Sequence, residues 1–134
     1  MVKNKNKELQ DEFKAMNRRK RKRLGQHFLK NPFVLRKIVR QISPQEGDLI
    51  IEIGAGKGAL TFPLTEKAGK VIAFEMDKSF IPDLKRRKIP NLIILGKDVL
   101  KADFRELLEK EGNEKKRVKV VGNLPYSISS PLLF

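Results

Sequence analysis

The sequence of 134 residues contains no cysteine and a single histidine. The missing thiols exclude disulfides, cysteine-ligated zinc and thiol catalysis, and one histidine excludes a multi-histidine metal site within one chain. No apolar run is long enough to cross a bilayer, and no apolar segment follows the basic start as it would in a secretory signal. We therefore expect a cytosolic protein of one domain, without a membrane span and without a metal site.

Acidic side chains are scarce in the first third of the chain. Residues 1–40 hold 14 basic and 3 acidic groups, so most of the net charge of +14 lies there. The densest run consists of Arg18, Arg19, Lys20, Arg21, Lys22 and Arg23. Six adjacent cations attract phosphates and predict salt-dependent binding of nucleic acid. The alternatives are a solubilising tail or a nuclear-localisation-like run, and an anionic membrane is less favoured because no strong apolar face accompanies the charges. We interpret residues 1–22 as a basic mobile arm.

From residue 31 onward, helix-like and strand-like segments alternate. Asn31 and Pro32 suit the start of a helix that should end near residues 43–44. Short apolar segments predict strands at residues 49–53, 70–75, 91–95 and 117–122, and the intervening segments predict helices at 59–67, 78–87 and 104–111. This alternation builds a parallel sheet with right-handed crossovers and flanking helices. Residues 127–134 predict the start of another helix, so we expect a sheet that is truncated after its fourth strand.

Three of the nine glycines lie between the first predicted strand and the following helix, in the string Gly54-Ala55-Gly56-Lys57-Gly58-Ala59. Glycine permits a tight turn and lets backbone N–H groups approach a ligand at a helix N-terminus. The string fits the pattern G-x-G-x-x-A of dinucleotide sites, and it is not a P-loop because the Gly-Lys-Ser/Thr ending is missing. A turn that serves packing alone is the alternative.

Side chains at the ends of the next two predicted strands extend this expected cofactor site. Glu75 can accept hydrogen bonds from both hydroxyls of a ribose, which NAD and S-adenosylmethionine both carry. Asp98 can accept from the amino group of an adenine, and Met76 can pack on the face of that ring. The alternatives are a solvated charge at Glu75, a capping role for Asp98 and an ordinary core position for Met76.

The four residues Asn123, Leu124, Pro125 and Tyr126 follow the fourth predicted strand. They therefore face the same crevice as residues 54–58, the glycine loop. An amide oxygen of Asn123 and a main-chain carbonyl can accept from the amino group of adenine, which favours a pyramidal nitrogen with its lone pair aimed at a methyl group. Pro125 stiffens the turn, and Tyr126 offers a ring for stacking a base. Such catalysis works by positioning and electrostatics. The alternative is a turn in which Asn123 caps a backbone and Tyr126 packs in the core.

Four motifs occur in order, at residues 25–29, 52–61, 98–100 and 123–131. Together they resemble the ribosomal RNA adenine dimethyltransferases that act on small-subunit RNA, and more loosely the erythromycin-resistance methyltransferases. The resemblance runs from about Arg23 to Phe134. It implies a Rossmann-like, S-adenosylmethionine-dependent methyltransferase fold, of which residues 23–134 form the N-terminal part. The last strands and the small helical domain of the family are missing from these residues.

The resemblance also implies an activity and a set of site residues. The activity is transfer of methyl groups from S-adenosylmethionine to N6 of two adjacent adenosines in small-subunit ribosomal RNA, within ribosome biogenesis. Ribosomal RNA, or an immature small ribosomal subunit, is the implied partner. The implied cofactor residues are His27, Leu29, Gly54, Ala55, Gly56, Glu75, Met76, Asp98, Val99 and Asn123. The implied catalytic residues are Asn123, Leu124, Pro125 and Tyr126, with Asn123 orienting the target amine and Tyr126 stacking on the flipped adenine.

Two departures from the family pattern concern the cofactor residues. His27 stands where many relatives have Asn, and Lys97 stands where a Gly is common before Asp98. Two other classes of function stay open at this point. One is an oxidoreductase that uses NAD through the glycine loop, which leaves residues 123–126 and the basic arm unexplained. The other is a non-catalytic module that binds RNA or the ribosome on a methyltransferase fold.

Overall fold

The computed structural model of the chain describes residues 30–111, 117–122 and 132–133. In chain order, the described elements are α3 (Pro32–Ile42), β1 (Asp48–Ile53), α4 (Thr61–Lys67), β2 (Lys70–Phe74), the 3-10 turn η1 (Lys78–Phe80), α5 (Ile81–Arg86), β3 (Leu92–Leu95), the 3-10 turn η2 (Val99–Lys101), α6 (Phe104–Glu111), β4 (Arg117–Gly122) and β5 (Leu132–Leu133). The four longer strands lie where the apolar segments predict them.

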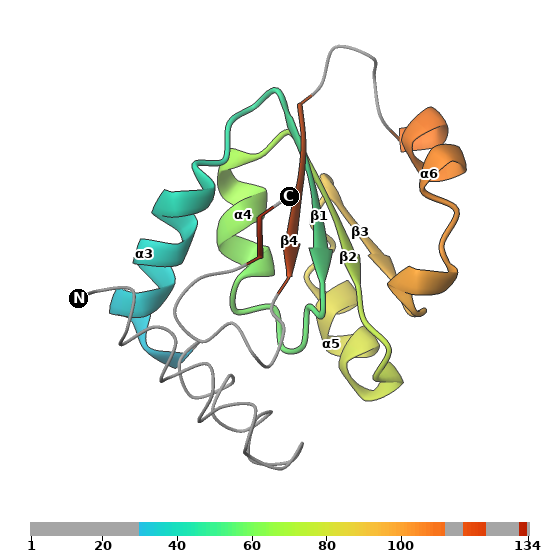
Figure 1. The fold of residues 1–134 in the computed structure, drawn as a ribbon. Coiled ribbons are helices and arrows are strands. Elements are labelled where there is room, and N and C mark those ends of the chain that lie inside the picture. The colour runs from blue at the N-terminus through green and yellow to red at the C-terminus, as the bar shows by residue number, and fades with distance from the viewer. Residues whose placement is uncertain (1–29, 112–116, 123–131, 134) are drawn as a thin grey trace, which may run out of the picture.

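Within the described residues, the strands form one sheet in the order β3-β2-β1-β4-β5 (Figure 1). The pairs β1–β2, β2–β3 and β1–β4 are parallel, as the alternating pattern predicts. The chain starts in the middle of the sheet, moves outward through β2 and β3, and then returns to β4 on the other side of β1. The order of strands therefore reverses between β1 and β4, which is where open α/β sheets bind their ligands.

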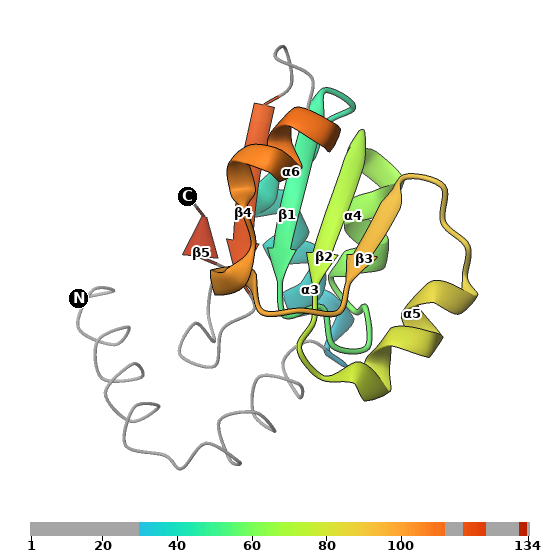
Figure 2. The same cartoon turned by 90° about the vertical axis from the view of Figure 1, so that its right-hand side faces the viewer.

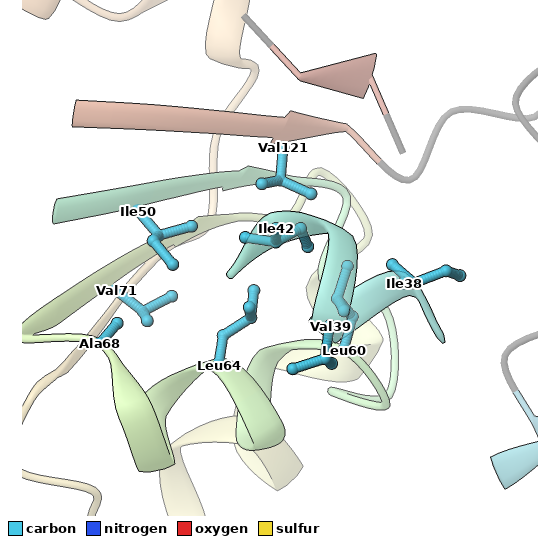
Figure 3. Close-up of a cluster of buried hydrophobic side chains, with 9 residues drawn as sticks. All are labelled: Ile38, Val39, Ile42, Ile50, Leu60, Leu64, Ala68, Val71 and Val121. Carbon is cyan, nitrogen blue, oxygen red and sulfur yellow. The ribbon is translucent and has the colours of Figure 1, made fainter. Parts of the chain in front are cut away.

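Helices cover both faces of the sheet, with α3, α4 and α5 on one face and α6 on the other (Figures 1 and 2). On the first face, Ile50, Val71 and Val121 pack against side chains of α3 and α4, as Figure 3 shows. On the second face, Ile51 and Phe74 belong to a cluster that α6 covers. Strand side chains alternate between the faces, so a sheet that is covered on both sides requires the continuous apolar runs seen in the sequence.

The first described helix is closed at both ends by its own sequence. The Oδ1 atom of Asn31 accepts hydrogen bonds from the backbone N–H groups of Phe33 at 2.9 Å and Val34 at 3.4 Å, and Pro32 opens the helix. Ser43 ends α3 in the left-handed region, with φ of 51°. The predicted bounds of α3 are confirmed. The helix packs on the sheet through Ile38, Val39 and Ile42, which are buried.

The prediction of a helix at residues 127–134 is wrong for the part that the structure describes. Leu132 and Leu133 form the short strand β5, which pairs antiparallel with Gly122 and Val121 of β4. The sheet therefore continues beyond its fourth strand. This pairing gives backbone partners to the last two residues of the outer edge of β4. In the described ranges, no helix is long and apolar enough to cross a membrane.

Candidate functional site

The carboxyl ends of β1, β2 and β3 bring several of the predicted cofactor residues to one edge of the sheet (Figure 2). Residues 54–58, named the glycine loop here, follow β1. Glu75 and Met76 follow β2, and Asp98 and Val99 follow β3. Parallel pairing places Ile53 opposite both Phe74 and Gly122, so the ends of β2 and β4 flank the start of the glycine loop.

The glycine loop has a backbone conformation that requires its glycines. Gly54, Gly56 and Gly58 have φ of 85°, 56° and 86°, in the region that L side chains rarely adopt. The N–H groups of Gly54 and Ala55 both donate to the carbonyl of Phe74, at 2.8 and 3.2 Å. A Cβ atom built on Gly56 would meet no atom within 4 Å, so open space lies beside this residue. A ligand can therefore approach the backbone of the loop closely.

Glu75 holds the glycine loop against the end of β2. Its Oε1 atom accepts from the N–H of Gly56 at 2.7 Å, and its Oε2 atom accepts from the N–H of Asp77 at 2.8 Å. The interpretation of Glu75 as a solvated charge is therefore wrong. Each carboxylate oxygen has a further lone pair, so Glu75 can still accept hydrogen bonds from the hydroxyls of a ribose. The sequence could not show its contact with Gly56, which spans 19 positions.

A second carboxylate lies close to this edge, and sequence analysis does not single it out. Glu52 on β1 is fully buried. Its Oε1 atom accepts a hydrogen bond from the hydroxyl of Thr61, at the start of α4, and within the described chain its Oε2 atom has no partner. Burial raises the pKa of Glu52 to about 7; the Thr61 hydroxyl acts in the opposite direction, and the negative charge of Glu75 adds to the rise. In the sequence, this buried acid is signalled by a charged residue within the otherwise apolar run of β1.

The residues after β3 only partly match their predicted roles. The Oδ1 atom of Asp98 accepts from the N–H of Leu100 at 2.9 Å and so caps η2, as the capping alternative holds. Val99 is half-buried and packs in the cluster under α6.

Two apolar side chains at this edge are exposed. Met76, after β2, is 66% exposed, so the interpretation of Met76 as an ordinary core residue is wrong. Leu100 is 88% exposed and follows the neighbouring strand. Exposed apolar side chains at this edge suit the face of an aromatic ring.

The remaining predicted site residues lie outside the described residues. They are the basic run Arg18, Arg19, Lys20, Arg21, Lys22 and Arg23, the cofactor residues His27 and Leu29, and the motif Asn123, Leu124, Pro125 and Tyr126. The structure does fix Gly122, which is buried, ends β4 and is paired with Ile53. Asn123 is therefore covalently attached to the residue that lies beside the start of the glycine loop.

The described residues fit a nucleoside cofactor. The glycine loop offers an open approach to its backbone, Glu75 offers acceptors for a ribose, and Met76 and Leu100 offer apolar surface for a base. No cluster of acidic or histidine side chains within the described ranges could hold a metal ion. This set of groups is the same for NAD and for S-adenosylmethionine, so geometry alone does not separate the two.

Comparison with known proteins separates them. The model of the family described as ribosomal RNA adenine dimethylase matches residues 17–134. The chain belongs to this family. Ribosomal RNA small subunit methyltransferase A of Leptothrix cholodnii is 46% identical over 114 residues, which cover 85% of this chain and 40% of the relative. The protein of the same name from Xylella fastidiosa is 42% identical over 125 residues, covering 92% and 46%. The chain therefore spans less than half the length of these dimethylase relatives.

Solved structures confirm the predicted fold of this dimethylase family member. A dimethyladenosine transferase from Plasmodium falciparum matches with a TM-score of 0.53 and 23% identity, over 69% of this chain and 42% of that one. The 23S rRNA methyltransferase ErmE matches with 0.52 and 18%, over 69% and 46%. An RNA methyltransferase from Salinibacter ruber, in complex with S-adenosyl-L-homocysteine, matches with 0.51 and 13%, over 69% and 74%. The chain thus has the Rossmann-like methyltransferase fold.

Proposed function

We propose that the protein is an S-adenosylmethionine-dependent methyltransferase that dimethylates N6 of two adjacent adenosines in small-subunit ribosomal RNA and so contributes to ribosome biogenesis. The observation that carries the proposal is the edge of the sheet where Glu75 holds the glycine loop and β4 ends directly before Asn123. Membership of the ribosomal RNA adenine dimethylase family supports the choice of cofactor and substrate. We also propose a cytoplasmic location for this activity.

The cofactor would be held mainly by residues at the carboxyl ends of the strands. When bound, S-adenosylmethionine supplies an activated methyl group. Gly54, Ala55 and Gly56 give its polar parts access to the loop backbone, and Glu75 accepts hydrogen bonds from its ribose. Met76 and Val99 lie beside the strand ends that would flank the adenine, and Asp98 is the candidate acceptor for the adenine amino group. We assign His27, Leu29 and Asn123 to the same site on the family pattern alone.

The substrate adenosine would be oriented by the motif at residues 123–126. The lone pair of an exocyclic amine is delocalised into the ring, which makes the nitrogen a poor nucleophile. Asn123 and a backbone carbonyl of the motif can each accept one N–H of that amine, which favours a pyramidal nitrogen. Pro125 would stiffen the turn, and Tyr126 would stack on the base after it leaves its helix. The proposed chemistry rests on positioning and on preorganised acceptors.

The basic run would contact the RNA backbone. Six cations at residues 18–23 can neutralise phosphates without reading sequence, so they would add affinity and salt dependence rather than specificity. We treat residues 1–22 as an RNA-binding arm and residues 23–134 as the N-terminal part of the methyltransferase domain. The RNA partner would be free small-subunit RNA or an immature small subunit.

Two measurements on the intact chain test the proposal. Calorimetric titration with S-adenosylmethionine and, in parallel, with NADH should show saturable binding of the methyl donor alone. Binding of NADH in its place would refute the proposed cofactor. Transfer of labelled methyl groups to unmodified small-subunit RNA should then be abolished by Asn123→Ala, with the affinity for RNA nearly unchanged. Binding of RNA without any transfer by the unaltered chain would favour a non-catalytic RNA- or ribosome-binding module.

A further inference from the structure

The ring of Phe62 lies directly against the last glycine of the glycine loop. A Cβ atom built on Gly58 would overlap the side chain of Phe62, on α4, with the Cζ atom 2.8 Å away. The backbone N–H of Phe62 also donates to the carbonyl of Gly58 at 3.0 Å. Gly58 is thus required both for its φ of 86° and for the space that the ring occupies. Phe62 and Gly58 are packed as a unit.

Arg87 also packs on the ring of Phe62. The guanidinium carbon of Arg87, the residue that caps the end of α5, lies 3.9 Å from the centre of the ring. This distance is well inside the range of a cation–π contact, and arginine can also stack flat on an aromatic face. Phe62 is half-buried and packs against a cluster that contains Ala55 of the loop and Leu84 of α5. One ring therefore connects the glycine loop, α4 and α5.

The glycine loop needs such a connection because it is built from residues that lose much conformational freedom on folding. Each glycine that is fixed costs more backbone entropy than any other residue type. From the side of β2, the carbonyl of Phe74 and the carboxylate of Glu75 hold residues 54–56. From the side of α4, the ring of Phe62 lies against Gly58. A loop that is already ordered binds a ligand more tightly, because it loses less conformational entropy when the ligand binds.

We propose that Phe62, held in place by Arg87, is a positioning residue that preorganises the glycine loop for its cofactor. The identity of the cofactor rests on the proposed function above. The positioning role, called the clamp below, rests on the packing of the Phe62 ring against Gly58 and of Arg87 against that ring. If Phe62 were core packing alone, an aliphatic side chain of similar size would leave ligand affinity unchanged. If it is a clamp, the flat ring and the cation are both needed.

The test measures the dissociation constant of S-adenosyl-L-homocysteine by calorimetry on the intact chain. Phe62→Leu, which keeps apolar volume but removes the ring, should weaken binding roughly tenfold, since the loop must then be ordered on binding. Arg87→Met should weaken it about two- to fivefold, the value of one partly exposed cation–π contact. The double variant should bind no more weakly than Phe62→Leu, because Arg87 acts through the ring. Phe62→Tyr should keep most of the affinity, and Arg87→Lys should keep part of it, because lysine retains the positive charge but cannot stack on the ring.

A matched control separates positioning from lost stability. Arg117→Met removes an ion pair with Asp48 at the amino end of β1, the end opposite the glycine loop, and should leave the dissociation constant unchanged although it slightly destabilises the fold. The proposal is overturned if Phe62→Leu binds the ligand as tightly as the unaltered chain. It is also overturned if Arg117→Met weakens binding equally, or if the effects of Phe62→Leu and Arg87→Met simply add.

Failure of the proposed function would give a different result. If the unaltered chain binds NADH and not S-adenosyl-L-homocysteine, the cofactor assignment fails, and the same variants are then compared with NADH. If it binds neither ligand, hydrogen exchange at the amides of Gly56 and Gly58 decides the clamp, because both are hydrogen-bonded inside the structure. Phe62→Leu should then accelerate exchange there more than Arg117→Met does, and equal rates would refute the positioning role of Phe62.

Discussion

Asp48 and Glu52 stand four positions apart on β1, and both carboxylates are fully buried, but their surroundings differ in charge. Lys119 places its Nζ atom 2.8 Å from Oδ2 of Asp48, and Arg117 places its Nε atom 3.2 Å from Oδ1. The backbone N–H of Gln45 donates to the same carboxylate at 2.8 Å. Burial acts to raise the pKa of Asp48, but the hydrogen bonds and positive charges of these groups outweigh it, so the pKa is lowered. Asp48 stays ionised.

Glu52 has a hydroxyl and a second carboxylate where Asp48 has two cations. The Thr61 hydroxyl donates to it and Glu75 repels its charge, so burial dominates and its pKa rises to about 7. Asp48 lies at the amino end of β1, where Lys119 also donates to the carbonyls of Ile42 and Ser43 at 2.9 Å. Glu52 lies one residue before the end of β1, at the carboxyl end where the glycine loop begins.

The comparison indicates that the two ends of the sheet are built for different purposes. At the amino end, the buried charge of Asp48 faces two cations, although its Oδ1 atom accepts no hydrogen bond among the described residues, and such pairing lowers the cost of burying a charge. At the carboxyl end, Glu52 has no ion pair within the part of the chain that the structure describes, and it lies beside the loop that would receive a ligand. Perturbed and poorly compensated groups concentrate at functional sites, so this asymmetry agrees with the carboxyl end as the working edge.

The largest expected effect comes from breaking the ion pair between Lys119 and Asp48. Lys119→Met would leave the buried carboxylate of Asp48 without its main cation, and should lower the free energy of unfolding by about 4 kcal/mol. Arg117→Met is the matched control; its side chain is 61% exposed, and its loss should cost at most about 1 kcal/mol. Urea denaturation at pH 7 measures both. Equal losses in the two variants would show that Lys119 has no special role.

The next effect is a pH dependence that belongs to Glu52. Its pKa is about 7 in the folded chain and 4.5 when the side chain is exposed to water, so the folded state holds a proton that the unfolded state releases in this range. Stability from Glu52 is therefore fully present below pH 4.5 and is lost as the pH rises through 7, by roughly 3 kcal/mol. Asp48, whose pKa is lowered from 3.8, does not titrate in this window.

Glu52→Gln isolates this contribution. The amide keeps an acceptor for the Thr61 hydroxyl but cannot ionise, so the variant should be more stable than the unaltered chain at pH 8 and nearly equal at pH 5. Urea denaturation in steps between these pH values gives the curve. A curve of the unaltered chain as flat as that of Glu52→Gln would show that Glu52 is already ionised at pH 5.

A smaller effect tests how the Thr61 hydroxyl acts on the pKa of Glu52. Thr61→Val removes the hydroxyl that favours the charged carboxylate while keeping the shape of the side chain. The pKa of Glu52 should then rise by about one, because the hydrogen bond to a charged group is lost. The titration of the Glu52 carboxyl carbon by NMR reports it directly. A downward change would mean that the hydroxyl favours the protonated acid.

The sequence could predict what depends on local patterns. The helix start at Asn31 and Pro32 follows from capping chemistry, and the bounds of β4 follow from an apolar run, because both signals lie within a few residues. The glycine loop was also predictable, since three glycines between a strand and a helix have few other uses. Local pattern failed at Leu132 and Leu133, which form a strand that pairs with Val121 and Gly122 of β4.

The candidate site depends on contacts that no local pattern encodes. Glu75 reaches Gly56 across 19 positions, and Arg87 reaches Phe62 from a different helix. The buried state of Glu52 follows from the packing of α4 on the sheet, and a reader of the sequence sees only a charge inside an apolar run. Strand ends locate the edge where ligands bind, whereas the interactions within that edge come from tertiary packing.

The smallest effect tests whether α3 shares the asymmetry of the sheet. Its last residues are held by Lys119 through the carbonyls of Ile42 and Ser43, whereas its first turn is held by the exposed cap Asn31. Asn31→Ala should cost about 1 kcal/mol, and Asn31→Asp, which keeps a capping oxygen, should cost little. Urea denaturation at pH 7 allows direct comparison with Lys119→Met. The buried pair must outweigh the exposed cap, because a cap that is lost at the surface is replaced by water, and a cation that is lost beside a buried carboxylate is not. A loss in Asn31→Ala as large as that in Lys119→Met would remove the distinction between the two ends of the helix.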